Sequence, residues 1–377
     1  MVSVVIDGNY LFYKTFSIFS SYGSKQPGDV LGNEQDRSVF MRKIITDICY
    51  ALNQLPVNGH VVFCKDSRSW RKDLKIERVD YKGDREKDEK VDWGCFFDLM
   101  DEFGKFLELN GYIYSSVKGA EGDDLLWFWN KKLRESGHNV VIFSGDKDSH
   151  QLIDEENGIW TICWNGNSKN NKIFCPPNWN ENYLNKEEDI SIFNLDMSND
   201  GEKDKMKILT ASATLEKTDP ERIIFEKILT GDKGDAVPSV FAYEKTPGKI
   251  FKVTPTKAVS IYESFKQSGW NKSGLQDIWK DDEFRDWISG YVLRAMNYTD
   301  NSDNRKIVAK NYEENAQLVW LSDQVIPESV LAGMEYEYSQ TNMEIRGLLL
   351  DRKNMIGRSK WDSHEAPSAF DPFKNYR

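Results

Sequence analysis

Short apolar runs, separated by longer segments of helical spacing, set the pattern of the first half of the chain. The runs cover residues 2–6, 60–64, 112–117 and 140–143, and each has the length and composition of a buried β-strand. Between them, apolar residues recur every three or four positions, most clearly over residues 39–52, as expected of helices that cover a sheet. This alternation predicts an α/β fold with a doubly wound, mainly parallel sheet.

The second half of the chain has a different, mainly helical pattern. Helices are predicted to begin at Asp219-Pro220 and at Thr254-Pro255, where a capping residue is followed by proline in the first turn. An aromatic and Asn-rich region at about residues 155–218 reads as a strand or hairpin followed by a long loop. We therefore expect a first domain over residues 1–218 that includes this insertion, a helical domain over 219–350, and a flexible tail over 351–377.

Composition narrows the class of protein. At 377 residues the chain is long enough for two domains. It has no apolar run of membrane-spanning length and no basic leader before the first strand, and its five cysteines contain no Cys-x-x-Cys pair. We expect a soluble cytoplasmic protein with reduced thiols. The net charge of −11 argues against a polyanionic partner, but the cations crowded into residues 68–85 leave nucleic acid open.

Acidic residues stand where the predicted elements meet. Each ends a strand, opens a helix or lies in a glycine-rich turn: Asp7, Asp66, Glu121, Asp123, Asp124, Asp146, Asp148, Asp232 and Asp235. Because parallel strands end at one edge of a sheet, we expect the acids from Asp7 to Asp148 to converge there, and the glycines around Asp232 allow a turn that brings the last pair toward them. Taken singly, each acidic segment is more often a solvated helix or loop end.

Crowded carboxylates point to a particular kind of cofactor. They repel each other unless some are protonated or cations neutralise them. Ligation by oxygen alone favours Mg²⁺ or Mn²⁺ over zinc. Next to the acids in the sequence, cations and aromatic residues suggest contacts to a phosphodiester, because cations hold phosphates and flat rings stack on bases. The candidates for such contacts are Arg68, Trp70, Arg71, Lys72 and Tyr81, although a solvated charged face is an equally good interpretation of that segment alone.

In their order, the acidic positions resemble the constellation of the 5′ nuclease family, which includes the flap endonucleases. Several further motifs are most similar to the RNase H of T-even phages, a 5′ to 3′ exonuclease. These motifs are Trp70-Arg-Lys-Asp73, Tyr81-Lys82, Asp92-Trp93 and Leu229-Thr-Gly-Asp-Lys-Gly-Asp235-x-Val237-x-Ser239-Val240. The resemblance extends from residue 2 to about residue 330.

The resemblance implies a PIN-like catalytic domain followed by a helix-three-turn-helix region that binds duplex. It places a helical arch at about residues 82–109, with Lys82 and Arg85 at its base on the scissile phosphate, and it makes Asp146 and Asp148 catalytic. Two Mg²⁺ ions are implied, with Mn²⁺ as a substitute. The first would be held by Asp7, Asp66, Glu121, Asp123 and Asp146, and Asp124, Asp148, Asp232 and Asp235 would lie around the second or in its water shell.

The same resemblance implies a role in replication. The enzyme would remove RNA primers and adjacent DNA from the 5′ ends of lagging-strand fragments, acting as a monomer on RNA/DNA hybrid or on duplex DNA with a 5′ end or flap, in the host cytoplasm if phage-encoded. After Asp235 the chain lacks the Gly-Ile-Gly hairpin of cellular flap endonucleases and presents Lys249 and Lys257, which we expect to contact nucleic acid. In the otherwise polar tail, Phe370 and Phe373 suggest a peptide that binds a phage sliding clamp or a single-strand-binding protein, and an untethered tail is the alternative interpretation.

Two alternatives stand beside this interpretation. A non-catalytic nucleic-acid-binding replisome protein would keep the fold without the chemistry, but binding alone gains nothing from negative charge gathered beside phosphates. A phosphatase with an aspartyl nucleophile needs a second acid two residues after the first, and Asn9 occupies that place. The sequence leaves open the preference between RNA and DNA and the choice between exonuclease and flap cutting.

Overall fold

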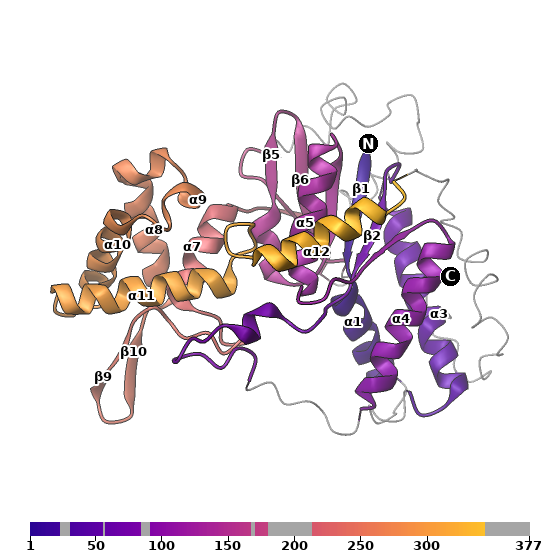
Figure 1. Ribbon diagram of the computed structural model, residues 1–377, viewed down its shortest axis with the longest axis horizontal. Helices are drawn as coiled ribbons and strands as arrows, with labels where there is room; N and C mark the ends of the chain where they lie inside the picture. The colour runs from indigo at the N-terminus through magenta and orange to yellow at the C-terminus, as the bar shows by residue number, and fades with distance from the viewer. Residues whose placement is uncertain (23–30, 56, 84–90, 167–169, 180–212, 344–377) are drawn as a thin grey trace. The chain divides into compact units, whose positions relative to one another are not determined.

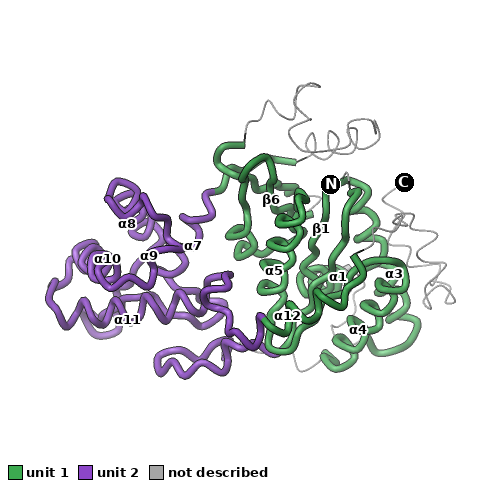
Figure 2. Tube along the Cα trace, turned by 45° about the horizontal axis from the view of Figure 1, so that its top comes forward, with its two compact units in different colours: residues 1–67, 87–218, 332–377 green, residues 68–86, 219–331 purple. Residues whose placement is uncertain are grey.

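The computed structural model describes residues 1–22, 31–55, 57–83, 91–166, 170–179 and 213–343. The chain divides into two compact units, shown in different colours in Figure 2. Unit 1 contains residues 1–67, 87–218 and 332–377, and unit 2 contains residues 68–86 and 219–331. Within the described part of the chain, no helix is both long enough and apolar enough to cross a membrane.

Unit 1 is built on a mostly parallel sheet (Figure 1). The expected strands are confirmed as β1 (Val2–Asp7), β2 (Val61–Cys64), β3 (Ile113–Ser115) and β4 (Asn139–Phe143), all of them parallel in the order β3-β2-β1-β4. The sheet continues through the aromatic region, where β6 runs parallel to β4 and β7 turns back against β6. These added strands are β5 (Asp154–Glu156), β6 (Ile159–Trp164), β7 (Lys172–Cys175) and β8 (Thr214–Lys217).

Helices cover both faces of this sheet because side chains alternate along its buried strands. In β1, Val2, Val4 and Ile6 join the core formed with α1 (Gly8–Tyr22), α3 (Glu34–Asn53) and α4 (Trp93–Leu109), where the Phe12 ring meets several other phenylalanines edge-on. The alternate residues of β1, Asp7 among them, therefore point to the other face, and α5 (Gly122–Glu135) packs against β1, β2 and β4.

Unit 2 is helical, as expected. Asp219 caps α7 (Pro220–Thr230) and Thr254 caps α8 (Pro255–Gln267), each through its side chain, so both predicted helix starts are confirmed. The connection between these helices contains a two-stranded hairpin that we did not predict. The remaining elements are η1 (Trp70–Asp73), β9 (Ala242–Thr246), β10 (Lys249–Lys252), η5 (Gly269–Lys272), α9 (Leu275–Ile278), α10 (Asp282–Ala295) and α11 (Ser302–Val319).

The two units are not the contiguous segments that the sequence suggested. Residues 68–86 pack with unit 2, where the Arg78 guanidinium donates to Glu314 Oε2 (2.6 Å) and to Asn315 Oδ1 (2.6 Å). Helix α12 (Glu328–Gln340) ends in unit 1, where Tyr338 packs against Trp129. The predicted tail at residues 351–377, most of the insertion and Arg85 lie outside the described residues.

Candidate functional site

Asp7 ends β1 and is anchored by two hydrogen bonds. Its Oδ1 accepts from the Tyr10 N–H (2.9 Å), and its Oδ2 accepts from the Ser144 hydroxyl (2.8 Å). The side chain is buried at the carboxyl end of the sheet. Burial, reinforced by the charges of Asp66 and Asp146, raises the pKa of Asp7 to about 7 although both hydrogen bonds oppose the shift. The charged form of this carboxyl group is therefore disfavoured where it lies.

Asp66 lies two residues after the end of β2, and its side chain contacts the start of α5. Its backbone N–H donates to Asn9 Oδ1 (2.9 Å), and its own Oδ1 accepts from the Gly122 N–H. Gly122 is the first residue of α5, and a Cβ there would lie 2.8 Å from Asp66 Oδ1. The glycine therefore lets the carboxylate reach the positive end of the helix.

Glu121 and Asp124 open α5 together as a capping box. The Glu121 side chain accepts from the Asp124 backbone N–H, and the Asp124 carboxylate accepts from the Glu121 N–H (3.1 Å). Both side chains are buried. Each therefore has a structural task at the helix start, and the predicted ligation of metal by these two acids stays a prediction.

Asp123 lies between the other acids. It is half-buried in the first turn of α5. Burial, followed by the charges of Asp7, Asp146, Asp148 and Asp66, raises its pKa well above the usual value. The charges of acids at the ends of β1, β2 and β4 thus act on this one side chain, and the predicted shared metal site stays a prediction.

Asp146 and Asp148 follow β4 on a short 3₁₀ helix, η2 (Lys147–Leu152). The exposed Asp146 caps it, since its Oδ1 accepts from the Asp148 N–H (3.0 Å). The Asp146 N–H in turn donates to the Ser144 hydroxyl oxygen (3.1 Å). Ser144 is therefore bonded to both Asp7 and Asp146, and it sets the loop after β4 against the end of β1.

Three residues near the ends of these strands were not among the predicted site residues. Ser144 and Asn9 orient Asp7 and Asp66, and the only sign of them was a small polar residue beside each acid. Glu337 is a further acid at the end of β3, where its carboxylate accepts from the Ser115 hydroxyl and the Ser116 N–H. No sequence signal connects residue 337 with this strand.

The donor set fits a hard divalent cation. Carboxylate oxygens dominate, and the Cys64 thiol next to Asp7 stays protonated because burial, and then the charge of Asp7, raises its pKa well above the usual value. No three Asp, Glu, His or Cys side chains among the described residues form a ready-made ligand set. Burial and neighbouring acids raise the pKa values of Asp7 and Asp123, and a bound cation would relieve that repulsion.

Asp232 and Asp235 belong to unit 2, where each already faces a cation. The Asp232 carboxylate lies 2.8 Å from Lys227 Nζ, and although burial alone would raise its pKa, Lys227 and two turn N–H groups lower it. The Asp235 carboxylate accepts from the Tyr81 hydroxyl (3.0 Å), and its backbone carbonyl accepts from the Lys82 N–H (2.9 Å). The predicted contribution of this pair to a metal site stays a prediction.

The predicted nucleic-acid contacts at residues 68–81 need correction. Trp70 and Arg71 are buried, and the Arg71 guanidinium lies 4.6 Å from the centre of the Trp70 indole, so the indole packs on arginine and offers no surface for a base. Tyr81 is also buried and is held by Asp235. Arg68 is exposed but forms an ion pair with Asp73 (2.7 Å), whereas Lys72 is exposed.

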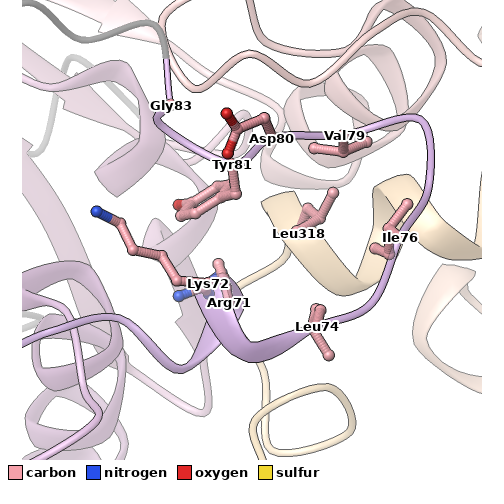
Figure 3. A pocket seen from close by; sticks show the side chains of 9 residues that line it. All are labelled: Arg71, Lys72, Leu74, Ile76, Val79, Asp80, Tyr81, Gly83 and Leu318. Carbon is pink, nitrogen blue, oxygen red and sulfur yellow. The ribbon is translucent and has the colours of Figure 1, made fainter.

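Lys72 also lies at a small pocket, shown in Figure 3. The pocket has a volume of about 390 Å³, and both apolar side chains, such as Leu74 and Leu318, and polar ones, such as Arg71 and Asp80, line it. Nothing in its lining matches the chemistry of the acidic cluster. The two lysines predicted further along the chain differ in exposure: Lys249 is exposed on the hairpin, and Lys257 is half-buried with its ammonium group 3.4 Å from Met296 Sδ.

Comparisons with known proteins agree with this architecture. Residues 2–183 match the family described as 5′-3′ exonuclease, N-terminal resolvase-like domain. A curated 5′-3′ exonuclease of Buchnera aphidicola subsp. Schizaphis graminum is 25% identical over 182 residues, which are 48% of this chain and 56% of that protein. The chain therefore spans about half the length of this relative.

Two solved structures are similar in fold. The T5 D15 protein co-crystallized with metal ions gives a TM-score of 0.51 at 13% identity, covering 96% of this chain and all of that one (100%). The T5 D15 flap endonuclease in a pseudo-enzyme-product complex with DNA and metal ions gives 0.50 at 14% identity, covering 90% of this chain and 98% of the other. At such low identity these likenesses establish the fold alone.

Proposed function

We propose that the chain is a metal-dependent 5′ nuclease, because residues 2–183 match the family described as 5′-3′ exonuclease, N-terminal resolvase-like domain. One observation supports this most directly: Asp7, Asp66, Asp123 and Asp146, from separate elements, act electrostatically on one another at the carboxyl edge of the sheet. Burial and the mutual repulsion of Asp7, Asp66, Asp123 and Asp146 disfavour the charged forms of Asp7 and Asp123, and a bound divalent metal would relieve that repulsion.

The proposed centre holds two Mg²⁺ ions, with Mn²⁺ as a substitute. Asp7, Asp66, Asp123 and Asp146 are the residues best placed to bind them. When bound, paired divalent ions activate a water and neutralise charge on the departing 3′ oxygen. The chain's own residues fix the ligands, because Ser144 and Tyr10 hold Asp7 while Gly122 holds Asp66.

The cations of the proposed mechanism come from residues 82–85. Lys82 has a left-handed backbone (φ 57°) fixed by its N–H bond to Asp235, so its position within unit 2 is well defined. We propose that Lys82 and Arg85 neutralise the charge that grows on the phosphate during hydrolysis.

The proposed substrates are 5′ ends annealed to a template. An RNase H of the phage type would remove RNA primers and adjacent DNA by cutting RNA/DNA hybrid or a 5′ flap. We further propose that it acts as a monomer and that Phe370 and Phe373 recruit a sliding clamp or single-strand-binding protein. A non-catalytic replisome protein on the same fold is the alternative.

A cleavage ladder tests this proposal. Labelled RNA/DNA hybrid, nicked duplex and 5′ flap would each be incubated with the full chain, in Mg²⁺ and in chelator. We expect Mg²⁺-dependent shortening from the 5′ end, abolished by Asp123→Asn and retained by Glu156→Gln, which alters an exposed acid on β5. Binding of these substrates without any metal-dependent cleavage would favour the non-catalytic alternative.

A further inference from the structure

The first turn of α1 contacts the loop that carries Asp146. Tyr10 follows Asp7 closely in the sequence, and its N–H donates to Asp7 Oδ1 (2.9 Å). The Tyr10 ring lies against Gly145, because a Cβ added at this glycine would come within 2.3 Å of the ring carbon Cζ and of the hydroxyl oxygen. Gly145 separates Ser144 from Asp146. Tyr10 therefore contacts both the acid that ends β1 and the backbone that leads into the acid after β4.

The hydroxyl end of the Tyr10 ring is held by the residue that follows β6. It donates to the Asn165 carbonyl oxygen (3.2 Å). Asn165 is itself fixed to the start of β7, since its N–H donates to the Lys172 carbonyl oxygen (3.2 Å) and its Oδ1 accepts from the Lys172 N–H (3.0 Å). The ring thus lies between the loop after β4 and the end of β6, and it contacts both.

Lys14 supports the ring from the next turn of α1. Its ammonium group lies 5.4 Å from the centre of the Tyr10 ring and 5.9 Å from the centre of the Phe143 ring. The same group donates to the Gly166 carbonyl oxygen (2.9 Å). Gly166 has a φ of 55°, and a Cβ there would lie 2.1 Å from the Phe143 ring, so this approach requires glycine. Lys14 is half-buried, which indicates a supporting role within unit 1.

We infer that Tyr10, supported by Lys14, is a positioning residue that sets the separation of Asp7 and Asp146, and thereby the affinity of the acidic cluster for divalent cations. Ligands from different elements bind a small cation tightly only when their distances are fixed, and residues that orient ligands are worth about 10- to 100-fold in metal affinity. Ser144 also bonds to both acids, and the Tyr10 ring adds a rigid spacer behind the loop. The inference rests on the proposed function in taking the cluster as a metal site.

Direct measurement of metal binding tests the inference without relying on cleavage. Electron paramagnetic resonance of free Mn²⁺ would give the Kd for Mn²⁺ of the full chain. For Tyr10→Ala we expect this Kd to rise about 10- to 100-fold, because the spacer is lost. Tyr10→Phe removes one hydrogen bond and should raise it less than about fivefold. The matched control, Tyr50→Ala, removes an exposed tyrosine of α3 and should bind Mn²⁺ as wild type does.

A double-mutant cycle tests the contact between the ring and Gly145. Gly145→Ala should raise the Kd for Mn²⁺ about tenfold in wild type, because the added methyl group displaces the ring, but less than about twofold in Tyr10→Ala, where the ring is gone. Thermal unfolding in chelator would establish that each variant is folded. An unchanged Kd in folded Tyr10→Ala, or equal losses from Gly145→Ala in both backgrounds, would overturn the inference.

Lys14→Met tests the support with less risk to the fold. Methionine keeps an apolar side chain beside the two rings but cannot bond to the Gly166 carbonyl, so we expect the Kd for Mn²⁺ to rise about tenfold. The control is Lys105→Met, which alters an exposed lysine of α4. Equal Kd values for these two variants would show that Lys14 has no part in positioning the acids.

The outcomes separate this inference from the nuclease proposal. If wild type binds Mn²⁺ and cleaves 5′ ends, and Tyr10→Ala binds Mn²⁺ equally well, the nuclease stands and the inference is wrong. If Tyr10→Ala loses Mn²⁺ affinity while wild type cleaves no 5′-ended substrate in Mg²⁺, the inference stands and the nuclease proposal is wrong. If wild type binds no Mn²⁺, both are wrong.

Discussion

Gly122 and Asp66 meet where α5 begins, through an N–H bond to Asp66 Oδ1 at a point where a Cβ would lie only 2.8 Å from the same oxygen. Gly122→Ala should therefore displace the carboxylate. Because alanine favours helix, we expect thermal stability to change little, by about 1 kcal/mol or less, while cleavage falls about tenfold to a hundredfold. The control is Gly269→Ala, since an added Cβ there meets nothing within 4 Å. Normal cleavage by Gly122→Ala would show that the position of Asp66 is unimportant.

Asp146→Asn should separate catalysis from binding. The exposed carboxylate caps η2 through one oxygen, which asparagine can replace, so the local fold should survive. We expect cleavage in Mg²⁺ to fall about a hundredfold to a thousandfold, with duplex affinity in chelator kept. Asp154→Asn, on the neighbouring strand β5, is the matched control and should cleave normally. Near-normal turnover of Asp146→Asn would remove this residue from the mechanism.

Neutralising Asp7 should abolish cleavage and stabilise the metal-free protein. Burial and like charges raise the pKa of Asp7 to about 7, so the ionised form destabilises the metal-free fold at pH 8. Asp7→Asn keeps an acceptor for the Tyr10 N–H and should stabilise the metal-free protein by about 1 to 4 kcal/mol while abolishing cleavage. Urea unfolding in chelator is the measurement, repeated in Mg²⁺, where the difference should shrink. A variant less stable than wild type in chelator would contradict the idea of uncompensated repulsion.

His138 should make unit 1 sensitive to acid. Its ring is buried, stacks on His60 at 5.4 Å and shares a hydrogen bond with Ser3 (2.7 Å). Burial, and then His60, lowers the pKa of His138 to about 4, below the value of about 6.5 in an unfolded chain. The fold therefore favours the neutral ring, and its contribution is complete above pH 6.5 and is lost as the pH falls toward 4. The loss should reach about 3 kcal/mol.

Urea unfolding at several pH values between 7.5 and 4 would measure this dependence. His138→Asn retains a hydrogen-bonding group but does not titrate in this range, so its stability should fall less steeply than that of wild type. Identical pH profiles would show that His138 is not responsible.

Arg78 should matter to unit 2 far more than its neighbour Arg68. Arg78 donates to Glu314 and to the buried Asn315 from a half-buried position, whereas Arg68 pairs with Asp73 in the open, with 69% of its side chain exposed. Arg78→Ala removes a donor from the buried Asn315 and leaves Glu314 with the Lys310 ammonium group at 3.7 Å, so it should cost about 3 kcal/mol. Arg68→Ala should cost about 1 kcal/mol or less. Equal losses in thermal unfolding would show that Arg78 does not anchor residues 68–86.

The features that could be predicted from the sequence are those that depend on a local pattern of apolar, acidic or turn residues. Buried strands followed directly by acids were enough to place Asp7, Asp66 and Asp146 at one edge of the sheet, because parallel strands leave few alternatives. The hairpin had a signal as well, since Pro247-Gly248 lies between two alternating segments, but the long helical stretch around it hid the pattern.

Contacts between distant residues could not be predicted in this way. Trp70 was expected to stack on bases because it lies among cations, yet burial and the Arg71 guanidinium determine its role. The bond between Ser115 and Glu337 joins residues 222 positions apart, and nothing local to either residue encodes it. Such contacts follow from the packing of whole elements, which periodicity alone does not specify.

The burial of Cys64 has a practical consequence for handling the protein. Oxidation and alkylation proceed through an accessible thiolate, and this thiol is fully buried and held in its protonated form beside Asp7. We therefore expect Cys64, on the strand that ends next to the acidic cluster, to react only slowly with peroxide and maleimide. Storage without a reducing agent should leave this part of the molecule undamaged.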